Sequence, residues 1–187
     1  MKLNSVESAL VNNPVRAAHQ HYREAAWFRR LAGGDLSGEH VLEVGCGRGV
    51  GSEVILDRLG ATRVTAFDLD ESMVELARRR LHDRPVSLAV GDVCEIEQPS
   101  GAVDAVVDFG IIHHVPDWQQ SIGEIARVLR PGGLLLFEEI PRRMLDTWAF
   151  RTLTVHPREN RFEAEDFAAE LARNGLHGTG TIEQHFA

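Results

Sequence analysis

Glu43 is the residue whose type and position most directly indicate binding chemistry. It stands near the end of a short apolar run that begins at Val41, and three glycines follow at alternate positions, Gly45, Gly47 and Gly49. A carboxylate at the end of a buried strand must be desolvated or given a partner. A diphosphate is the wrong partner for it, so we expect a cationic ligand. The glycines allow positive φ angles and a close approach of that ligand to the backbone.

Two further carboxylates follow later apolar runs. Asp68 ends the run that starts at Arg63 and stands about 20 positions after Gly47, an interval typical of the carboxylate that holds ribose hydroxyls in nucleoside-binding α/β folds. One carboxylate accepts two hydroxyl protons at once, which explains the residue type. Asp92 follows Gly91 after a third run, where it is either a ligand-binding group or an ordinary turn aspartate.

His113 and His114 come directly after the fourth apolar run, 103–110. In open α/β sheets a ligand binds outside the carboxyl ends of the strands where the strand order reverses, here strands one and four. The two histidines are therefore expected near the reaction centre, where an imidazole has the pKa of a general base. Alternatively, they hydrogen-bond only the backbone or a cofactor group.

The residues between these motifs predict strands alternating with helices. Strands are expected at 41–44, 63–68, 86–90, 103–110 and 134–137. Helices are expected after the first, second and fourth of these strands, with a further helix at 162–174. Such alternation predicts an α/β fold, a Rossmann-like doubly wound and mostly parallel sheet with helices on both faces. Only about one more strand, near 180–186, fits after the last helix.

An additional helix is predicted ahead of the first strand. Asn13 and Pro14 form a helix start, and Gly33 ends it. Val15, Ala18, Tyr22 and Ala25 fall on one face of this helix. It either packs on the sheet or covers the ligand as a lid, and in the second case Tyr22 contributes to the site.

Size and composition bound the function. The chain has 187 residues, one domain's worth, and a net charge of −8, which argues against a nucleic-acid backbone as the principal partner. No apolar run is long enough to span a membrane, and the first ten residues lack a secretory signal, so the cytoplasm is the expected location. Cys46 and Cys94 form neither a metal spacing nor a disulfide framework.

These motifs together resemble, in order and spacing, the class I S-adenosylmethionine-dependent methyltransferases of the small-molecule branch (methyltransferase type 11). The resemblance covers about 41–137 and rests on Glu43 with its glycines, Asp68, Asp92, the 108–110 segment and the turn at 129–133. It implies strand order 3-2-1-4-5. It also implies a closing hairpin, of which the last strand is expected to be missing here.

The resemblance further implies a set of cofactor contacts. Glu43 would face the methionine ammonium of S-adenosylmethionine, Asp92 would accept from the adenine amino group, and Val93 would pack near the ring. Methyl transfer would leave S-adenosylhomocysteine and would require no metal. The residues expected at the cofactor are Glu43, Gly45, Cys46, Gly47, Asp68, Leu69, Met73, Asp92, Val93, Phe109 and Gly110.

The expected acceptor is a small molecule with an oxygen, nitrogen or carbon nucleophile. It would lie between the helix of Tyr22, the loop of His113 and His114, and an insertion at 141–161 that offers Trp148 as an apolar wall. The expected division is a helical cap at 1–34, a cofactor-binding core at 41–139, this insertion, and a C-terminal helix and strand at 162–187. Neither the acceptor nor the oligomeric state follows from the sequence.

Two other functions remain open. One is a protein that binds S-adenosylmethionine without catalysis. The other is a nicotinamide-dependent oxidoreductase, which Glu43 disfavours and whose G-x-G-x-x-G pattern requires glycine where Val50 stands.

Overall fold

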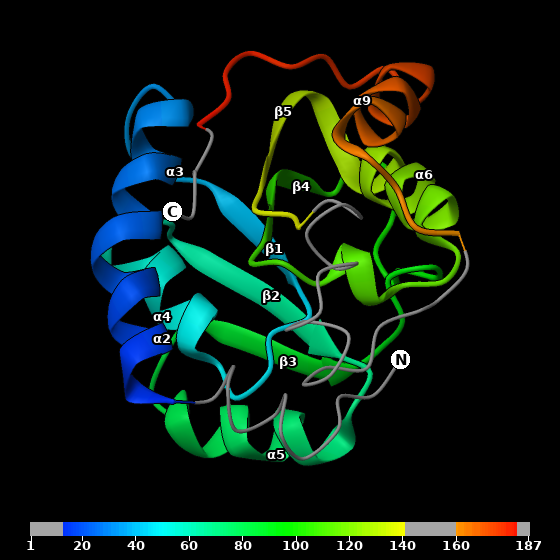
Figure 1. Cartoon of the computed structure of the whole chain (residues 1–187). Coiled ribbons are helices and arrows are strands. Elements are labelled where there is room, and N and C mark those ends of the chain that lie inside the picture. Colours follow the sequence, from blue (N-terminus) through cyan, green and yellow to red (C-terminus); the bar gives the residue numbers. More distant parts are fainter. Residues whose placement is uncertain (1–12, 141–159, 183–187) are drawn as a thin grey trace.

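A single sheet of five parallel strands organises the computed structural model, which describes residues 13–140 and 160–182. The strand order is β3-β2-β1-β4-β5, as predicted (Figure 1). The central strand β1 pairs with β2 on one side and β4 on the other. The strands are β1 His40–Val44, β2 Arg63–Asp68, β3 Val86–Val90, β4 Val103–Asp108 and β5 Leu129–Phe137.

The central position of β1 follows from its composition. Val41, Leu42 and Val44 are fully buried, because helices cover both faces of the sheet and a strand between them reads as a continuous apolar run. The edge strand β3 is more exposed along its length. The carboxyl ends of β1 and β4 diverge at the reversal of strand order, where the ligand was expected.

Most helix boundaries agree with the capping signals in the sequence. Asn13 Oδ1 accepts the Arg16 N–H at 2.8 Å and Asp70 Oδ1 accepts the Ser72 N–H at 3.0 Å, both as predicted N-caps. The helical elements are α2 Pro14–His19, η1 Gln20–Glu24, α3 Ala25–Leu31, α4 Val50–Asp57, α5 Glu71–Arg80, η2 Ile112–His114, α6 Trp118–Val128 and α9 Ala164–Arg173.

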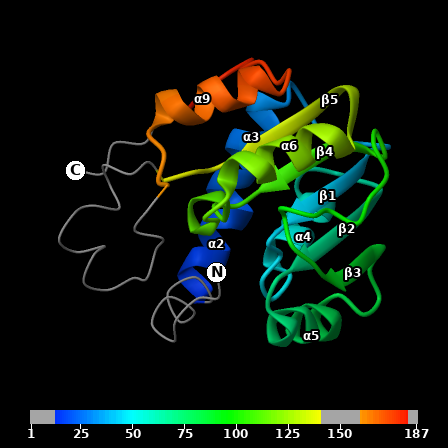
Figure 2. The same cartoon turned by 90° about the vertical axis from the view of Figure 1, so that its right-hand side faces the viewer.

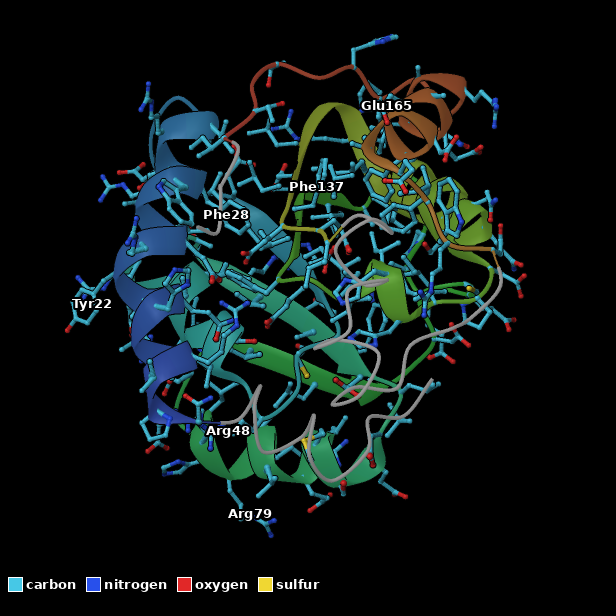
Figure 3. The ribbon with its side chains drawn as sticks, in the orientation of Figure 1. Tyr22, Phe28, Arg48, Arg79, Phe137 and Glu165 are labelled. Atoms are coloured by element: carbon cyan, nitrogen blue, oxygen red, sulfur yellow. The ribbon has the colours of Figure 1, made fainter. Side chains whose placement is uncertain are left out.

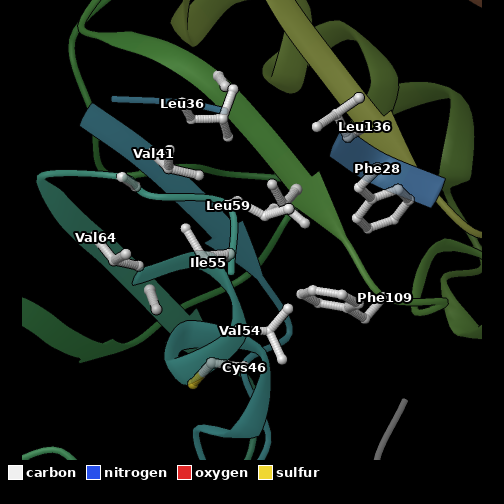
Figure 4. Packing of buried hydrophobic residues seen from close by; sticks show 14 of the residues in the cluster. Phe28, Leu36, Val41, Cys46, Val54, Ile55, Leu59, Val64, Phe109 and Leu136 are labelled. Atoms are coloured by element: carbon white, nitrogen blue, oxygen red, sulfur yellow. The ribbon is translucent and has the colours of Figure 1, made fainter. Parts of the chain in front are cut away.

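Two apolar layers hold these helices against the sheet. On one face, α3, α4 and α5 pack through residues such as Phe28, Ile55 and Ala77 (Figure 4). On the other face, α6 and α9 pack through an aromatic cluster in which Phe162 lies 4.9 Å from Trp118 and 4.7 Å from Phe167, centroid to centroid. Figure 2 shows α9 and α6 lying over β5 and β4.

The helix ahead of the sheet differs from its predicted geometry. The chain forms one continuous helical segment from Pro14 to Leu31, but its middle part, η1, is a π-helix. The predicted apolar face is wrong, since Val15 and Tyr22 are exposed. The buried side of η1 instead carries the polar residues Gln20 and Glu24. Glu24 is paired there with Arg16 and His19 of the same helical segment.

The predicted C-terminal strand is only partly within the described residues. Its first residues, 180–182, form no strand, and the remainder lies outside the described ranges. The segment that leaves α9 crosses back to the end of α3 (Figure 1), where a side chain at Gly180 would touch Leu31. Among the helices that the structure describes, none is long and apolar enough to cross a membrane.

Candidate active site

A cavity of about 330 Å³ opens at the carboxyl edge of the sheet, where β1, β2 and β4 end. Every residue predicted from the sequence to contact a cofactor lines this cavity. The contact with a cofactor stays a prediction. These lining residues are Glu43, Gly45, Cys46, Gly47, Asp68, Leu69, Met73, Asp92, Val93, Phe109 and Gly110.

The loop after β1 forms one wall of the cavity through its glycines. Gly45, Gly47 and Gly49 all adopt positive φ angles, as the sequence predicted. At Gly45 the close approach is made by the protein itself, because a Cβ there would lie 2.6 Å from Ile111 Cγ2. At Gly47 nothing lies within 4 Å of the position of a Cβ, so this part of the loop faces open space.

Glu43 is a buried carboxylate at the floor of the cavity. Its exposed fraction is 2%, and the Ser52 hydroxyl donates a hydrogen bond to its Oε2. Burial raises the pKa of Glu43 to about 8, against the opposing effect of the Ser52 hydrogen bond, and the nearby Asp68 and Asp108 raise it further. A cation in the cavity would reverse this effect, because it favours the ionised carboxylate.

Asp68 connects the ends of two strands. Its Oδ2 accepts the Gly47 N–H and its Oδ1 accepts the Asp70 N–H, both at 2.8 Å. The carboxylate therefore fixes the glycine loop, a role that the sequence did not reveal. Each carboxylate oxygen has a second lone pair, so Asp68 retains acceptor capacity for ribose hydroxyls.

Asp92 combines the two alternatives that the sequence left open. Its Oδ1 accepts the Cys94 N–H at 2.8 Å, which is the behaviour of a turn aspartate. The same residue lines the cavity together with Val93 and Leu69. The turn role is present in the structure, and the contact with an adenine remains a prediction.

Several polar residues of the cavity were missed from the sequence, among them Arg16, Gln20 and Arg48. Arg48 Nε is buried and has no hydrogen-bond partner among the described residues (Figure 3). Arg16 forms an ion pair with Glu24 and lies 3.5 Å from the Phe109 carbonyl oxygen. The place of Arg48 inside the glycine loop is the signal that could have identified it, whereas no sequence pattern identified Arg16 or Gln20.

The two residues predicted to contact the methyl acceptor are Tyr22 and Trp148. Tyr22 does not line this cavity: it is 67% exposed and points outward (Figure 3) with Arg58 5.1 Å from its ring, and its contact with an acceptor stays a prediction. The helix turns this residue to solvent because its neighbours Gln20 and Glu24 occupy the buried side. Trp148 lies outside the described residues.

The two histidines take separate roles in the structure. The short helix η2 turns them in different directions, so His114 lines the cavity and His113 does not. His113 is buried, with its Nδ1 2.6 Å from Glu139 Oε2. His113 as a group that touches a ligand in this cavity is therefore wrong, and the alternative in which it bonds within the protein applies to it.

Comparisons with known proteins agree with the fold and the motifs. Residues 42–137 match a family model described as a methyltransferase domain. A probable S-adenosylmethionine-dependent methyltransferase of Mycolicibacterium smegmatis is 33% identical over 96% of this chain and 74% of its own length. A fatty-acid O-methyltransferase of the same organism is also 33% identical, over 68% of this chain, which spans only 47% of that relative.

Solved structures share the architecture. A crystal structure of a methyltransferase dependent on S-adenosylmethionine from Aquifex aeolicus has a TM-score of 0.72 at 20% identity, covering 93% of this chain and 89% of that one. The putative methyltransferase in complex with an activator from Haloferax volcanii has a TM-score of 0.77 at 21% identity, covering 91% and 73%. With the matched domain and the conserved arrangement of strands, the chain belongs to the class I S-adenosylmethionine-dependent methyltransferases.

Proposed function

We propose that the cavity binds S-adenosylmethionine and that the chain transfers its methyl group to a small molecule that enters beside His114. The observation that carries the proposal is the convergence of the buried carboxylate Glu43, the loop-holding carboxylate Asp68 and the guanidinium of Arg48, whose Nε is buried, on one cavity. These groups complement an ammonium, a pair of hydroxyls and a carboxylate, which are the polar groups of the proposed cofactor.

The size of the cavity also suits a small-molecule ligand. Its volume of about 330 Å³ is at the lower end of the range usual for small-molecule sites. In the proposed arrangement Glu43 holds the ammonium, Asp68 holds the ribose, and Arg48 or Arg16 holds the carboxylate. Asp92, Val93 and Leu69 then surround the adenine.

The protein's contribution to the reaction would be orientation and exclusion of water. When bound, the cofactor supplies an electrophilic methyl group on a sulfonium. Placing a nucleophile in line with this group provides much of the rate. His114 is the histidine among the described residues at the cavity, and an imidazole can act as a general base, a role that an oxygen acceptor would need and a neutral nitrogen or carbon acceptor would not.

The names of the relatives suggest which acceptors to screen first. They include a fatty-acid O-methyltransferase and a ubiquinone biosynthesis O-methyltransferase of Coxiella burnetii. A lipid-like molecule with a carboxyl or hydroxyl oxygen is therefore the first acceptor class for this chain. The absence of a nucleic-acid partner and a cytoplasmic location stay predictions.

The purified chain is expected to bind S-adenosylhomocysteine and not NADH. Isothermal titration calorimetry with each ligand measures this directly. Binding of NADH without S-adenosylhomocysteine would favour the oxidoreductase alternative. Binding of S-adenosylhomocysteine without product from any acceptor in a broad library would favour a non-catalytic binding protein.

Binding of S-adenosylhomocysteine at about pH 7 is also expected to release a proton from Glu43. The pKa of this carboxyl is raised to about 8 without a ligand, so it is mostly protonated at neutral pH. An adjacent ammonium lowers that pKa, and the proton leaves. The release should fade as the pH rises above about 8, where Glu43 is already ionised.

Calorimetry in two buffers of different ionisation enthalpy measures this proton count. The Glu43→Gln variant is the matched control, since it keeps the shape of the side chain and has no proton to release. Equal proton release by the wild type and by this variant would place Glu43 away from the ammonium.

A further inference from the structure

Two buried carboxyl side chains hold the backbone of the loop that forms one wall of the cavity. Asp108 Oδ1 accepts the N–H groups of Gly110 and Ile111, at 2.9 and 2.8 Å. Glu139 Oε1 accepts the Ile112 N–H at 2.7 Å, and its Oε2 accepts the His113 N–H at 3.2 Å. Four consecutive amides, 110–113, thus depend on one side chain from the end of β4 and one that follows β5.

These two carboxyl groups are neighbours in a place that water does not reach. Asp108 is fully buried, and the side chain of Glu139 is 6% exposed. Two negative charges at such a site repel each other and lose their hydration, so at neutral pH one of the two carboxyl groups keeps its proton. Asp108 Oδ2 is buried and accepts no hydrogen bond in the described part of the chain, which is where a shared proton would reside.

The charged and titratable groups around the pair also favour a proton on Asp108 and a negative charge on Glu139. His113 Nδ1 contacts Glu139, so the imidazole that can donate a hydrogen bond faces Glu139. The centroid of the His114 ring lies 4.2 Å from that of the His113 ring. Burial and the facing Glu139 raise the pKa of Asp108 well above its usual range, while burial raises that of Glu139 to about 7. Glu43 faces Asp108 from β1 and adds a further negative charge when it ionises.

We propose that Asp108 and Glu139 form one proton-sharing carboxyl pair, with the proton on Asp108, that positions the 110–114 loop at the cavity. They are positioning residues, because they act through the loop and neither is expected to touch an acceptor. Gly110 and Ile111 form cavity wall, and His114 ends the same short helix, so the pair sets where these groups stand. Only this last consequence rests on the proposed function.

The proposal predicts opposite outcomes for two isosteric variants. In Asp108→Asn the amide oxygen can still accept both N–H groups, and the amide N–H can donate to Glu139 as the acid proton does. In Glu139→Gln a single oxygen replaces two acceptors, so the N–H of Ile112 or His113 loses its partner. Asp108→Asn should therefore preserve the loop and Glu139→Gln should release it.

Amide hydrogen exchange, followed by NMR on the whole chain, tests this at the bonds themselves. After correction for intrinsic rates, exchange at 112–113 should be at least about tenfold faster in Glu139→Gln than in the wild type, and unchanged in Asp108→Asn. A tenfold change corresponds to about 1.4 kcal/mol. Release of the 110–113 amides in Asp108→Asn, or no release in Glu139→Gln, would overturn the proposal.

The pH dependence provides a second readout that a purely structural role would not change. Raising the pH through the elevated pKa of Asp108 removes the shared proton and leaves two buried charges, so the wild-type amides 110–113 should lose protection at alkaline pH, above the pKa of about 7 of Glu139. Asp108→Asn has no such proton and should keep its protection across this range. The same alkaline loss of protection in the wild type and in Asp108→Asn would overturn the proposal. This comparison does not need Glu139→Gln, so it decides even if that variant does not fold.

S-Adenosylhomocysteine titrations of the same proteins separate this inference from the proposed function. A wild type that binds no S-adenosylhomocysteine would refute the proposed function, while hydrogen exchange would still decide on the carboxyl pair. A wild type that binds it, with loop amides that respond equally to both variants, would refute the pair alone.

Discussion

Gly51→Ala is expected to abolish S-adenosylhomocysteine binding and to destabilise the fold by about 1–3 kcal/mol, the usual cost of inserting a methyl group into a packed site. Gly51 lies in the first turn of α4, beneath the cavity. A Cβ there would overlap Glu43 Oε1 and would lie 2.7 Å from Phe109 Cδ2. Both neighbours are buried, so neither moves aside into solvent. The added methyl group therefore displaces the carboxylate that the cofactor ammonium needs.

The same substitution elsewhere in the chain provides a matched control. Gly123 lies inside α6, and a Cβ there would meet Asn174 Oδ1 at 3.6 Å, an ordinary contact. Gly123→Ala is expected to stabilise the chain by roughly 0.5–1 kcal/mol, because alanine loses less entropy than glycine in a helix. Chemical denaturation and calorimetry measure both variants. Normal ligand affinity in Gly51→Ala would show that Glu43 does not contribute to binding.

The fold was predictable because each strand carries its own signal in the sequence. The ranges 63–68 and 86–90 agree with β2 and β3 residue for residue, since apolar and β-branched runs between turn residues indicate buried strands. The predicted strand 134–137 is the carboxyl part of β5, which begins at Leu129. The difference arises because Leu129 already pairs with Val103, and the ladder resumes at Leu134 opposite Ala105, with 130–133 in the irregularity between them.

The site was predictable only where single residues follow a strand. Glu43, Asp68 and Asp92 stand at strand ends, and parallel strands bring such ends to one edge. The helix ahead of the sheet gave no comparable guide, because periodicity places apolar residues inward and this helix presents Arg16 and Gln20 to the cavity. A π-helix changes the helical phase, and no periodic pattern in the sequence predicts one.

The pair of Asp108 and Glu139 illustrates a second reason why the sequence did not predict some residues of the site. Asp108 was part of the recognised motif, but its partner Glu139 follows another strand, β5, and lies beside Asp108 only in the folded chain. Sequence spacing contains no information on which of two adjacent histidines faces a carboxylate. His113 and His114 were therefore indistinguishable until the direction of η2 was known.

Asp68→Ala is expected to weaken S-adenosylhomocysteine binding by about 1–3 kcal/mol, roughly tenfold to more than a hundredfold. The variant loses the acceptor for ribose hydroxyls and leaves the Gly47 and Asp70 N–H groups without their partner. Because the ribose is shared, 5′-methylthioadenosine should lose a similar factor although it lacks the amino-acid part. Glu43→Gln, by contrast, should weaken S-adenosylhomocysteine and leave 5′-methylthioadenosine nearly unchanged.

Asp104→Ala is the matched control for Asp68→Ala. Asp104 also accepts a backbone N–H, that of His40 at 2.6 Å, but it stands near the start of β4, at the opposite edge of the sheet. Removing it should cost stability, since it also pairs with Arg130, and should leave the affinity for both ligands intact. Equal losses of affinity in the two variants would mean that Asp68 acts through general stability. Loss confined to Asp68→Ala, with the same factor for both ligands, would assign it to the ribose.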